Sequence, residues 1–312
     1  MLIAVKDTYE LKLNASAQLS LPLGLVQTLR TRLGKPADSW LRYRLPQIIG
    51  LCQSRWGLEV EEAIPGGATA VVLAVRKAGM SAVLKVHPER ELAERELHGW
   101  QLWAGKGMPS LLEHDVELNV SLQERVIPAR SLAEVGDRDI AALAATGLLA
   151  RLHSVGRPLN LPTLSTLIAR RFTGAQALVK EGQAVVTSDL LSRAREVADR
   201  LLLESGPDVA LHGDFFPDNI LFSQQRGWLA IDPQACRGDA AFDAGTWSYA
   251  YGRGGQLRSN AELFAQHLGV SSERISGWAL VVAVTNLAGR AAYGHADQAE
   301  VATTLAACQE LL

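Results

Sequence analysis

The strongest constraint on the fold is a pair of short apolar segments that end in polar residues and are joined by a polar turn. The first segment runs from Asn219 to Phe222 and the second from Trp228 to Asp232, with Ser-Gln-Gln-Arg-Gly between them. Two apolar segments joined in this way predict a β-hairpin. If Phe222 pairs with Leu229, the register places Asn219 opposite Asp232 at the open end of the hairpin.

A third polar residue, Asp214, lies five positions before Asn219 in the sequence His-Gly-Asp, and we expect it near the same end of the hairpin. An amide oxygen and a carboxylate that face one point suit Mg2+, which takes oxygen ligands and completes its shell with water and phosphate oxygens. A proton acceptor beside such an ion predicts transfer of a phosphoryl group. The alternative is a polar turn in which Asp and Asn only cap loops, but the combined spacing favours the functional interpretation.

Composition excludes several other classes of function. The chain has 312 residues, a net charge of -2, 48% hydrophobic and 21% charged residues, which is typical of a soluble globular protein. This charge argues against a nucleic-acid partner, and no apolar run reaches membrane-spanning length, so we expect no membrane partner. The few cysteines, Cys52, Cys236 and Cys308, predict reduced thiols in the cytoplasm rather than disulfides or a zinc site. Nothing in the sequence indicates an oligomeric state.

The N-terminal part of the chain is predicted to be rich in strands. The first forty residues are expected to be irregular, because proline and glycine interrupt any long element. Helices are expected over Pro46–Trp56 and from Pro88 to about Ala104. Strands are expected at Leu58–Ile64, Thr69–Val75, Ser81–Val86, Leu111–Leu112, Glu117–Val120 and Leu122–Val126.

The sequence becomes mostly helical after about Ser131. The clearest helical segments are Asp139–His153, Leu164–Lys180 and Asp189–Leu203. We therefore expect an α+β fold with two unequal lobes, a β-rich lobe over residues 1–127 and a helical lobe over residues 128–312 that contains the hairpin. A cleft between two such lobes is a common place for a ligand site.

Lys85 lies in the apolar strand expected at Ser81–Val86, and the following helix supplies a partner for it. Glu96 shares a helical face with Trp100 and Trp103, so its carboxylate faces the core. A buried charge without a partner is very costly. We therefore predict an ion pair between Lys85 and Glu96, with Arg125 as the alternative partner for Glu96.

Gly66 and Gly67 join the two strands before Lys85, and a glycine turn allows the backbone to approach phosphates closely. By itself such a turn is weak support for a phosphate site, and no Gly-Lys-Ser/Thr sequence follows it. The order along the chain is informative, however: a glycine turn, a strand Lys, a helix Glu, then Asp, Asn and Asp. Protein kinases have this order.

The chain resembles the aminoglycoside phosphotransferase family, a branch of the protein-kinase-like fold, and within it the streptomycin 6-phosphotransferase and hydroxyurea phosphotransferase branch. The resemblance covers roughly residues 46–251. The segments that carry it are Leu45–Pro46, Arg55–Leu58, Gly66–Gly67, Val83–Val86, Leu102–Gly105, Leu149–His153, His212–Asp214, Trp228–Pro233 and Gly238–Asp243.

The resemblance implies a kinase that uses ATP or GTP and Mg2+ to phosphorylate a hydroxyl group of a small molecule. Carried over by position, Asp214 accepts or orients the substrate hydroxyl, and Asn219 and Asp232 hold Mg2+. The implied nucleotide-binding residues are Gly66, Gly67, Lys85 with its partner Glu96, and the adenine-binding hinge Gln123, Glu124, Arg125 and Val126. His212 and Asp243 are implied to brace the catalytic loop.

The acceptor is less constrained than the chemistry. Phe216 and Asp218 stand where the family often has His and Gly, beside the expected position of the substrate hydroxyl. A cationic aminoglycoside requires carboxylates in its pocket: Asp218 is one candidate, Asp297 and Glu300 are others, and Asp239 and Asp243 are expected to be structural. The resemblance implies a streptomycin-like aminoglycoside or hydroxyurea as the acceptor. The alternatives are a metabolite such as a sugar or amino alcohol, or no acceptor at all, in a nucleotide-binding pseudokinase. Intact Lys85, Asp214, Asn219 and Asp232 argue against the pseudokinase.

Overall fold

The computed structural model describes residues 8–13, 18–66, 69–155, 160–204, 206, 208–251, 255–292 and 296–312. It divides into two compact units. The first unit comprises Met1–Leu97 and Pro109–Arg125, and the second comprises His98–Met108 and Val126–Leu312. The assignment of His98–Met108 to the second unit was not anticipated from the sequence.

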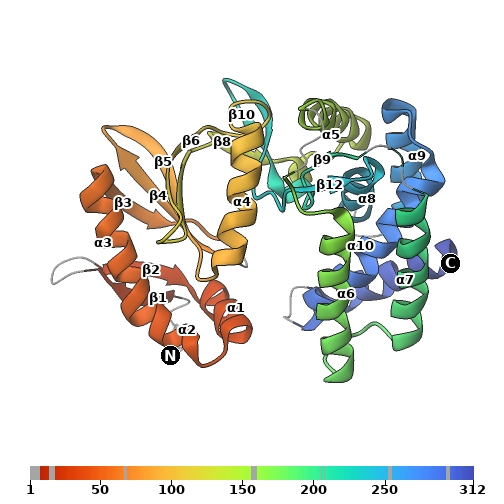
Figure 1. Cartoon of the computed structure of the whole chain (residues 1–312), viewed down its shortest axis with the longest axis horizontal. Coiled ribbons are helices and arrows are strands. Elements are labelled where there is room, and N and C mark those ends of the chain that lie inside the picture. Colours follow the sequence, from red (N-terminus) through yellow and green to blue (C-terminus); the bar gives the residue numbers. More distant parts are fainter. Residues whose placement is uncertain are drawn as a thin grey trace, which may run out of the picture. The chain divides into compact units, whose positions relative to one another are not determined.

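An antiparallel sheet of five strands, in the order β3-β4-β5-β7-β6, forms the centre of the first unit (Figure 1). The strands are β3 (Leu58–Ala63), β4 (Val71–Lys77), β5 (Met80–Val86), β6 (Leu111–Asp115) and β7 (Val120–Glu124). The first three confirm the sequence prediction. The two strands expected over residues 117–126 are one strand, because Asn119 has a positive φ of 56° and the turn between β6 and β7 occupies the preceding residues.

The expectation that the first forty residues are irregular was wrong. They form a hairpin of β1 (Thr8–Lys12) and β2 (Gln18–Pro22), followed by α1 (Leu23–Leu33) and α2 (Pro36–Ser39). A π-helical turn, Trp40–Arg44, leads into α3 (Leu45–Trp56). The prolines and glycines delimit these short elements: Pro36 opens α2, and Gly34, with a φ of 62°, ends α1.

Helix α4 (Arg90–Trp103) begins two residues after Pro88 and contributes residues to both units. The second unit also contains α5 (Arg138–His153), α6 (Leu164–Lys180), α7 (Ser188–Leu203), α8 (Ala241–Ala250), α9 (Leu257–Leu268), α10 (Ser272–Ala292) and α11 (Gln298–Leu311). The predicted bounds of α5, α6 and α7 are confirmed to within one residue. Side chains of Asp137, Thr163 and Thr187 cap the N-termini of these three helices.

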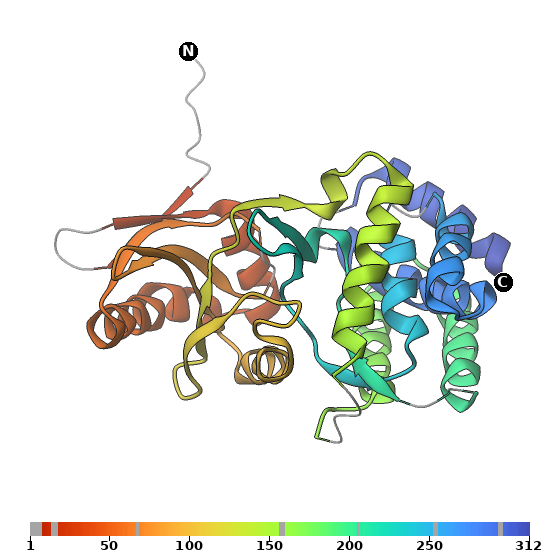
Figure 2. The same cartoon turned by 90° about the horizontal axis from the view of Figure 1, so that it is seen from above.

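Helix α10 is the core helix of the second unit. It packs against α6, α7, α8, α9 and α11, while α5 packs against α9 (Figure 2). In the part of the chain that the structure describes, α10 is the one helix long and apolar enough to cross a membrane, but 67% of its most apolar stretch is buried inside the protein. Its apolar composition is accounted for by this packing.

The predicted hairpin is present as β10 (Ile220–Ser223) and β11 (Gly227–Ala230), and β10 also pairs with β8 (Pro128–Ser131). Its register differs by one residue from the prediction, since Phe222 pairs with Trp228 rather than Leu229. The cause is an odd, three-residue loop closed by Gly227, whose φ is 70°. Nearby, β9 (Val209–Leu211) pairs with β12 (Cys236–Gly238).

Candidate active site

The His-Gly-Asp segment leaves the end of β9 and turns sharply against the segment that precedes β12. Gly213 has a φ of 77°, and a Cβ atom at this position would lie 2.3 Å from the backbone oxygen of Gln234. The Gln234 N–H donates a hydrogen bond of 2.8 Å to the carbonyl oxygen of His212. The close approach of these two backbones therefore requires glycine.

Asp243 on α8 accepts hydrogen bonds from the backbone of the same turn. Its completely buried carboxylate accepts the N–H of His212 at 2.8 Å through Oδ2 and the N–H of Gly213 at 2.9 Å through Oδ1. The Nε2 atom of His153 lies 3.3 Å from Oδ2. These contacts place Asp243 where the resemblance implies that it braces the loop.

His212 supports the loop through ring packing. Its buried ring stacks on Trp103 with a centroid distance of 6.4 Å and meets the edge of Phe215 at 5.7 Å. Burial lowers the pKa of His212, although the charges of Asp243 and Asp214 oppose that shift. The ring is therefore a neutral packing element, which agrees with the architectural role that the resemblance implies.

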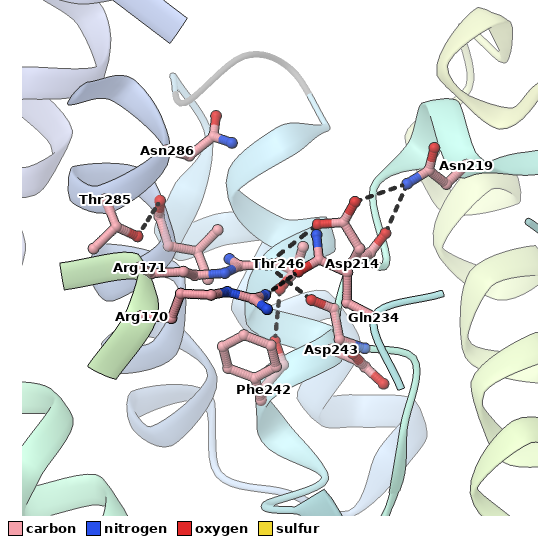
Figure 3. Close-up of polar contacts among 12 residues, drawn as sticks. Arg170, Arg171, Asp214, Asn219, Gln234, Phe242, Asp243, Thr246, Thr285 and Asn286 are labelled. Carbon is pink, nitrogen blue, oxygen red and sulfur yellow. Dashed lines mark hydrogen bonds and ion pairs between the residues drawn. The ribbon is translucent and has the colours of Figure 1, made fainter. Parts of the chain in front are cut away.

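Asn219 ends a short 3-10 turn, Pro217–Asn219, and contacts Asp214 directly. Its Nδ2 atom donates to the carbonyl oxygen of Asp214 at 2.9 Å and to Oδ2 of the same residue at 3.3 Å. The amide oxygen of Asn219 is thereby directed away from these two oxygens. Figure 3 shows Asn219 and Arg171 approaching Asp214 from opposite sides.

Arg171 on α6 is a site residue that the sequence analysis missed. One of its terminal nitrogens lies 2.8 Å from the carbonyl oxygen of Gly213 and 3.2 Å from Oδ1 of Asp214. The sequence did contain a signal, because Arg171 lies three residues after Ile168 and four before Ala175, both buried. A charged residue at the edge of an apolar helical face needs a partner, which is the argument that identified Glu96.

The electrostatic environment of Asp214 is set by burial and by its charged neighbours. Burial raises the pKa of Asp214, and the negative charge of Asp232 adds to the increase. The guanidinium of Arg171 acts in the opposite direction, but the pKa remains above its ordinary value. The charges of Asp232 and Arg171 therefore act on Asp214 in opposite directions.

Asp232 follows β11 at the open end of the hairpin and has a φ of 59°. A positive φ is uncommon outside glycine and is found at functional sites. The Ile231 N–H donates to the carbonyl oxygen of Asn219 at 2.9 Å, which joins the two ends of the hairpin. An Asp carboxylate and an Asn amide oxygen fit Mg2+, which binds proteins through few ligands. Among the described residues no group of three or more His, Cys, Asp and Glu side chains could hold a metal.

The first unit contains the predicted Lys85–Glu96 pair. Lys85 Nζ lies 2.8 Å from Glu96 Oε2, and both residues are buried. The other possible partner, Arg125, instead lies near Glu61 and Glu62. Burial by itself raises the pKa of Glu96, but the Lys85 ammonium and a hydrogen bond from His87 outweigh it and the pKa is lowered. Glu96 is therefore a carboxylate that remains ionised in the core.

The position of Gln123 differs from the one expected of an exposed hinge residue. It lies inside the sheet, paired with Val83 on β5 and Leu111 on β6, so its backbone is enclosed by neighbouring strands. Its side chain donates to Glu96 Oε1 at 3.0 Å and to Ser121 at 2.9 Å. Gln123 thus supports the Lys85–Glu96 pair and does not belong to an exposed hinge.

The other residues predicted to bind the nucleotide are Glu124, Arg125, Val126, Gly66 and Gly67. Glu124 ends β7, where its carboxylate accepts the Ser110 N–H at 2.9 Å, and Arg125 and Val126 follow it. Gly66 has a φ of 101° and open space where a Cβ would lie. Gly67 falls outside the described residues.

Most carboxylates considered for the acceptor pocket have structural partners. Asp239 accepts from Arg274 at 2.7 Å and from the indole of Trp278 at 2.6 Å, as expected of a structural residue. Asp297 caps α11, and buried Glu300 pairs with Arg290 at 3.1 Å. Asp218, in the catalytic loop, is exposed to solvent.

The chain has a protein-kinase-like fold. Similar solved structures include choline kinase LicA from Streptococcus pneumoniae, with a TM-score of 0.66 and 15% identity over 86% of this chain and 99% of that one. Another is a thermostable mutant of aminoglycoside phosphotransferase APH(4)-Ia in a ternary complex with AMP-PNP and hygromycin B, with a TM-score of 0.58 and 13% identity over 84% and 96% of the two chains. At these identities the structures show the fold alone.

Residues 55–294 match the family described as aminoglycoside/hydroxyurea antibiotic resistance kinase, and the chain belongs to this family. It is 32% identical to a streptomycin 6-kinase of Streptomyces griseus over 290 residues, which cover 88% of this chain and 92% of the relative. It is also 32% identical to a hydroxyurea phosphotransferase of Kitasatospora aureofaciens over 277 residues, covering 86% and 80%. The protein is therefore a kinase that transfers a phosphoryl group from ATP to a small molecule.

Proposed function

We propose that this kinase phosphorylates a hydroxyl group of a streptomycin-like aminoglycoside, and that it does so in the cytoplasm. The observation that carries the proposal is the 32% identity to a streptomycin 6-kinase, which extends over 88% of the chain and so includes both units. The His-Gly-Asp loop and the hairpin lie within the matched family region. The similarity that supports a streptomycin-type acceptor therefore extends over both units and the catalytic loop.

In this proposal Asp214 accepts a hydrogen bond from the acceptor hydroxyl and orients its oxygen toward the γ-phosphorus. As the new oxygen–phosphorus bond forms, the bond between the γ-phosphorus and the β–γ bridging oxygen breaks and ADP leaves. The hydroxyl proton passes to the Asp214 carboxylate. Positioning contributes more than base strength when the transition state is loose. The loop contacts from Asp243 and Asn219 keep Asp214 in place.

The amide oxygen of Asn219 and the carboxylate of Asp232 would hold Mg2+. When bound, the ion would neutralise charge on the phosphate oxygens. The donor set on this chain fits that role because it consists of hard oxygen atoms.

For the nucleotide, we propose that Lys85 contacts its phosphates, with Glu96 fixing the ammonium. Gly66 and Gly67 would cover the phosphates, and the backbone of Glu124, Arg125 and Val126 would contact the adenine. Of the predicted hinge, Gln123 is left out because it is enclosed in the sheet. ATP is the expected donor, and a comparison of ATP with GTP tests the preference.

The experiment is a transfer assay with γ-labelled ATP, Mg2+ and streptomycin, followed by mass spectrometry and NMR of the product to locate the phosphate. We expect phosphorylation at the 6-hydroxyl. Asp214→Ala should lower kcat by about 100- to 10,000-fold, the typical contribution of a positioned proton acceptor. Asp199→Ala is the control, since this exposed Asp lies on α7, outside the catalytic loop. Turnover of Asp214→Ala at the wild-type rate would overturn the assignment.

Hydroxyurea is the second candidate acceptor. The identity to a hydroxyurea phosphotransferase equals that to the streptomycin 6-kinase, at 32%. The same assay with hydroxyurea, and with a sugar and an amino alcohol, distinguishes the candidates through their kcat/KM values. Preference for the sugar or amino alcohol over both antibiotics would indicate a metabolite kinase instead.

A further inference from the structure

We propose that Arg171 is a positioning residue of the phosphoryl-transfer site, which holds the Asp214 side chain and the Gly213 carbonyl in the reacting geometry. The inference rests on the proposed role of Asp214 and adds a residue from α6, outside the His-Gly-Asp loop and the hairpin. It assigns a function to a residue that no sequence motif indicated.

The contacts of Asp214 show how its side chain is fixed. Oδ1 lies 3.2 Å from the terminal nitrogen of Arg171, and Oδ2 lies 3.3 Å from Nδ2 of Asn219. Each carboxylate oxygen thus has a donor on a different structural element. The same nitrogen of Arg171 also donates to the Gly213 carbonyl at 2.8 Å, so Arg171 fixes both the backbone and the side chain of the loop.

Arg171 is itself held in place. Its guanidinium carbon lies 5.4 Å from the ring centre of Phe242, the residue next to Asp243 on α8, and only 13% of its side chain is exposed. The start of α6 is anchored to β12, because the Arg237 N–H donates to the carbonyl oxygen of Pro162 at 2.8 Å. A donor on packed, anchored helices can hold a reacting group more precisely than one on a loop.

The charge of Arg171 also has a function here. The carboxylates of Asp214 and Asp232 repel each other in a site where burial strengthens electrostatic interactions. A cation on the Oδ1 side of Asp214 opposes this repulsion and prevents the side chain from turning away. Neighbouring Arg170 does not duplicate the contact, because it donates to the side-chain oxygen of Gln234 at 2.6 Å.

Arg195 on α7 provides a matched control in the same unit. Its guanidinium carbon lies 5.2 Å from the ring centre of Phe172, and its Nε lies 2.9 Å from Asp199. It therefore has the same two kinds of contact as Arg171, an aromatic ring and an aspartate, without contacting the catalytic loop. Arg195→Ala measures the effect of losing such an arginine when no reacting residue is involved.

The test measures kcat, KM for ATP and KM for streptomycin in the wild type, Arg171→Ala, Arg171→Lys and Arg195→Ala. We expect Arg171→Ala to lower kcat about 100-fold, as for a small misplacement of a reacting group, with KM for ATP changed less than threefold. The kcat of Arg171→Lys should lie between those of the wild type and Arg171→Ala, because a lysine ammonium keeps the positive charge but lacks the planar guanidinium donor. Arg195→Ala should behave as the wild type, and added ethylguanidinium should partly restore Arg171→Ala.

A double substitution shows whether Arg171 acts through Asp214. In an Asp214→Asn background, Arg171→Ala should reduce the residual rate by less than threefold, since residues that act as a unit are non-additive. The proposal would be overturned if Arg171→Ala lowered kcat in the Asp214→Asn background as much as it does in the wild-type background. A wild-type kcat in Arg171→Ala would also overturn it. If Arg171→Ala does not fold, Arg171→Lys alone decides, and a wild-type rate in that variant counts against the proposal. Failure of the proposed function is seen separately, as no transfer by the wild type or full activity in Asp214→Ala.

Discussion

Lys85 Nζ lies 2.8 Å from Glu96 Oε2, and the two side chains are only 4% and 7% exposed. His87 and Gln123 also contact the Glu96 carboxylate, at 2.9 and 3.0 Å. Two opposite charges in a core depend on each other, because removal of one leaves the other buried without its counter-charge. This relationship makes the pair a structural requirement of the first unit as well as a nucleotide-binding candidate.

We therefore expect Lys85→Ala to lower the free energy of unfolding by about 3–5 kcal/mol, the usual cost of leaving a buried charge without its partner. The double variant Lys85→Met with Glu96→Gln should be more stable than Lys85→Ala, because it leaves no charge at either position of the pair. Urea denaturation measures both effects. Arg76→Ala breaks an exposed pair with Glu61 in the same unit and should change the stability little. Equal losses in Lys85→Ala and Arg76→Ala would contradict the prediction.

The buried ring of His212 predicts a dependence of stability on pH. Its pKa is lowered by burial, so between that lowered value and the ordinary value near 6.5 the unfolded chain binds a proton that the folded chain does not. Stability should therefore rise with pH in this window and fall on acidification, by at most about 1.4 kcal/mol per pH unit for this single group.

The pH prediction is checked by urea denaturation of the wild type and His212→Asn between pH 5 and 8. The slope of stability against pH should be smaller in the variant. His114→Gln, at an exposed position on β6, serves as the comparison. An identical slope in the wild type and His212→Asn would show that His212 does not cause the effect.

The sequence predicts those parts of the site that depend on short-range patterns. Glu96 was found because helical periodicity places its carboxylate on a buried face, and only a nearby cation satisfies it there. The hairpin was found because two apolar segments flank a polar turn, but its register was not, because the turn contains three residues rather than an even number. Turn geometry depends on the φ of Gly227, which periodicity does not encode.

The sequence patterns did not predict contacts between residues that are far apart in the chain. Arg171 reaches Asp214 across 43 positions, and Trp103 stacks on His212 across a still longer stretch of the chain. Gln123 was assigned to a hinge by analogy, whereas the sheet order encloses it between β5 and β6. The order of strands in a sheet is a tertiary property. Here β7 pairs with β5 and β6 lies at the edge, although β6 comes first in the chain.

Asp232 predicts a specific effect on nucleotide binding. Asp232→Asn keeps the size of the side chain and tolerates the φ of 59°, because Asn is among the residues that adopt positive φ. It removes the negative charge that Mg2+ requires. Titration calorimetry with a non-hydrolysable ATP analogue should show that Mg2+ strengthens binding to the wild type but not to Asp232→Asn. Asp218→Asn should retain the Mg2+ effect, and retention of that effect in Asp232→Asn would remove Asp232 from the metal site.

Two helical glycines predict opposite effects of the same substitution. A Cβ added to Gly99 on α4 would lie 2.3 Å from Cγ of Pro233, the residue after Asp232, whereas nothing lies within 4 Å of a Cβ at Gly147 on α5. Gly147→Ala should raise the free energy of unfolding by up to about 1 kcal/mol, the helix-propensity difference between the two residues.

Gly99→Ala should instead lower the free energy of unfolding by about 1–3 kcal/mol, as overpacking does in a well-packed core. A proline ring cannot rotate out of the way, so α4 or Pro233 must move, and movement of Pro233 displaces the backbone of Asp232. We therefore expect kcat to fall in Gly99→Ala and to remain unchanged in Gly147→Ala. Thermal denaturation and the streptomycin transfer assay measure the two effects, and equal stabilities for both variants would show that α4 does not require glycine at this contact.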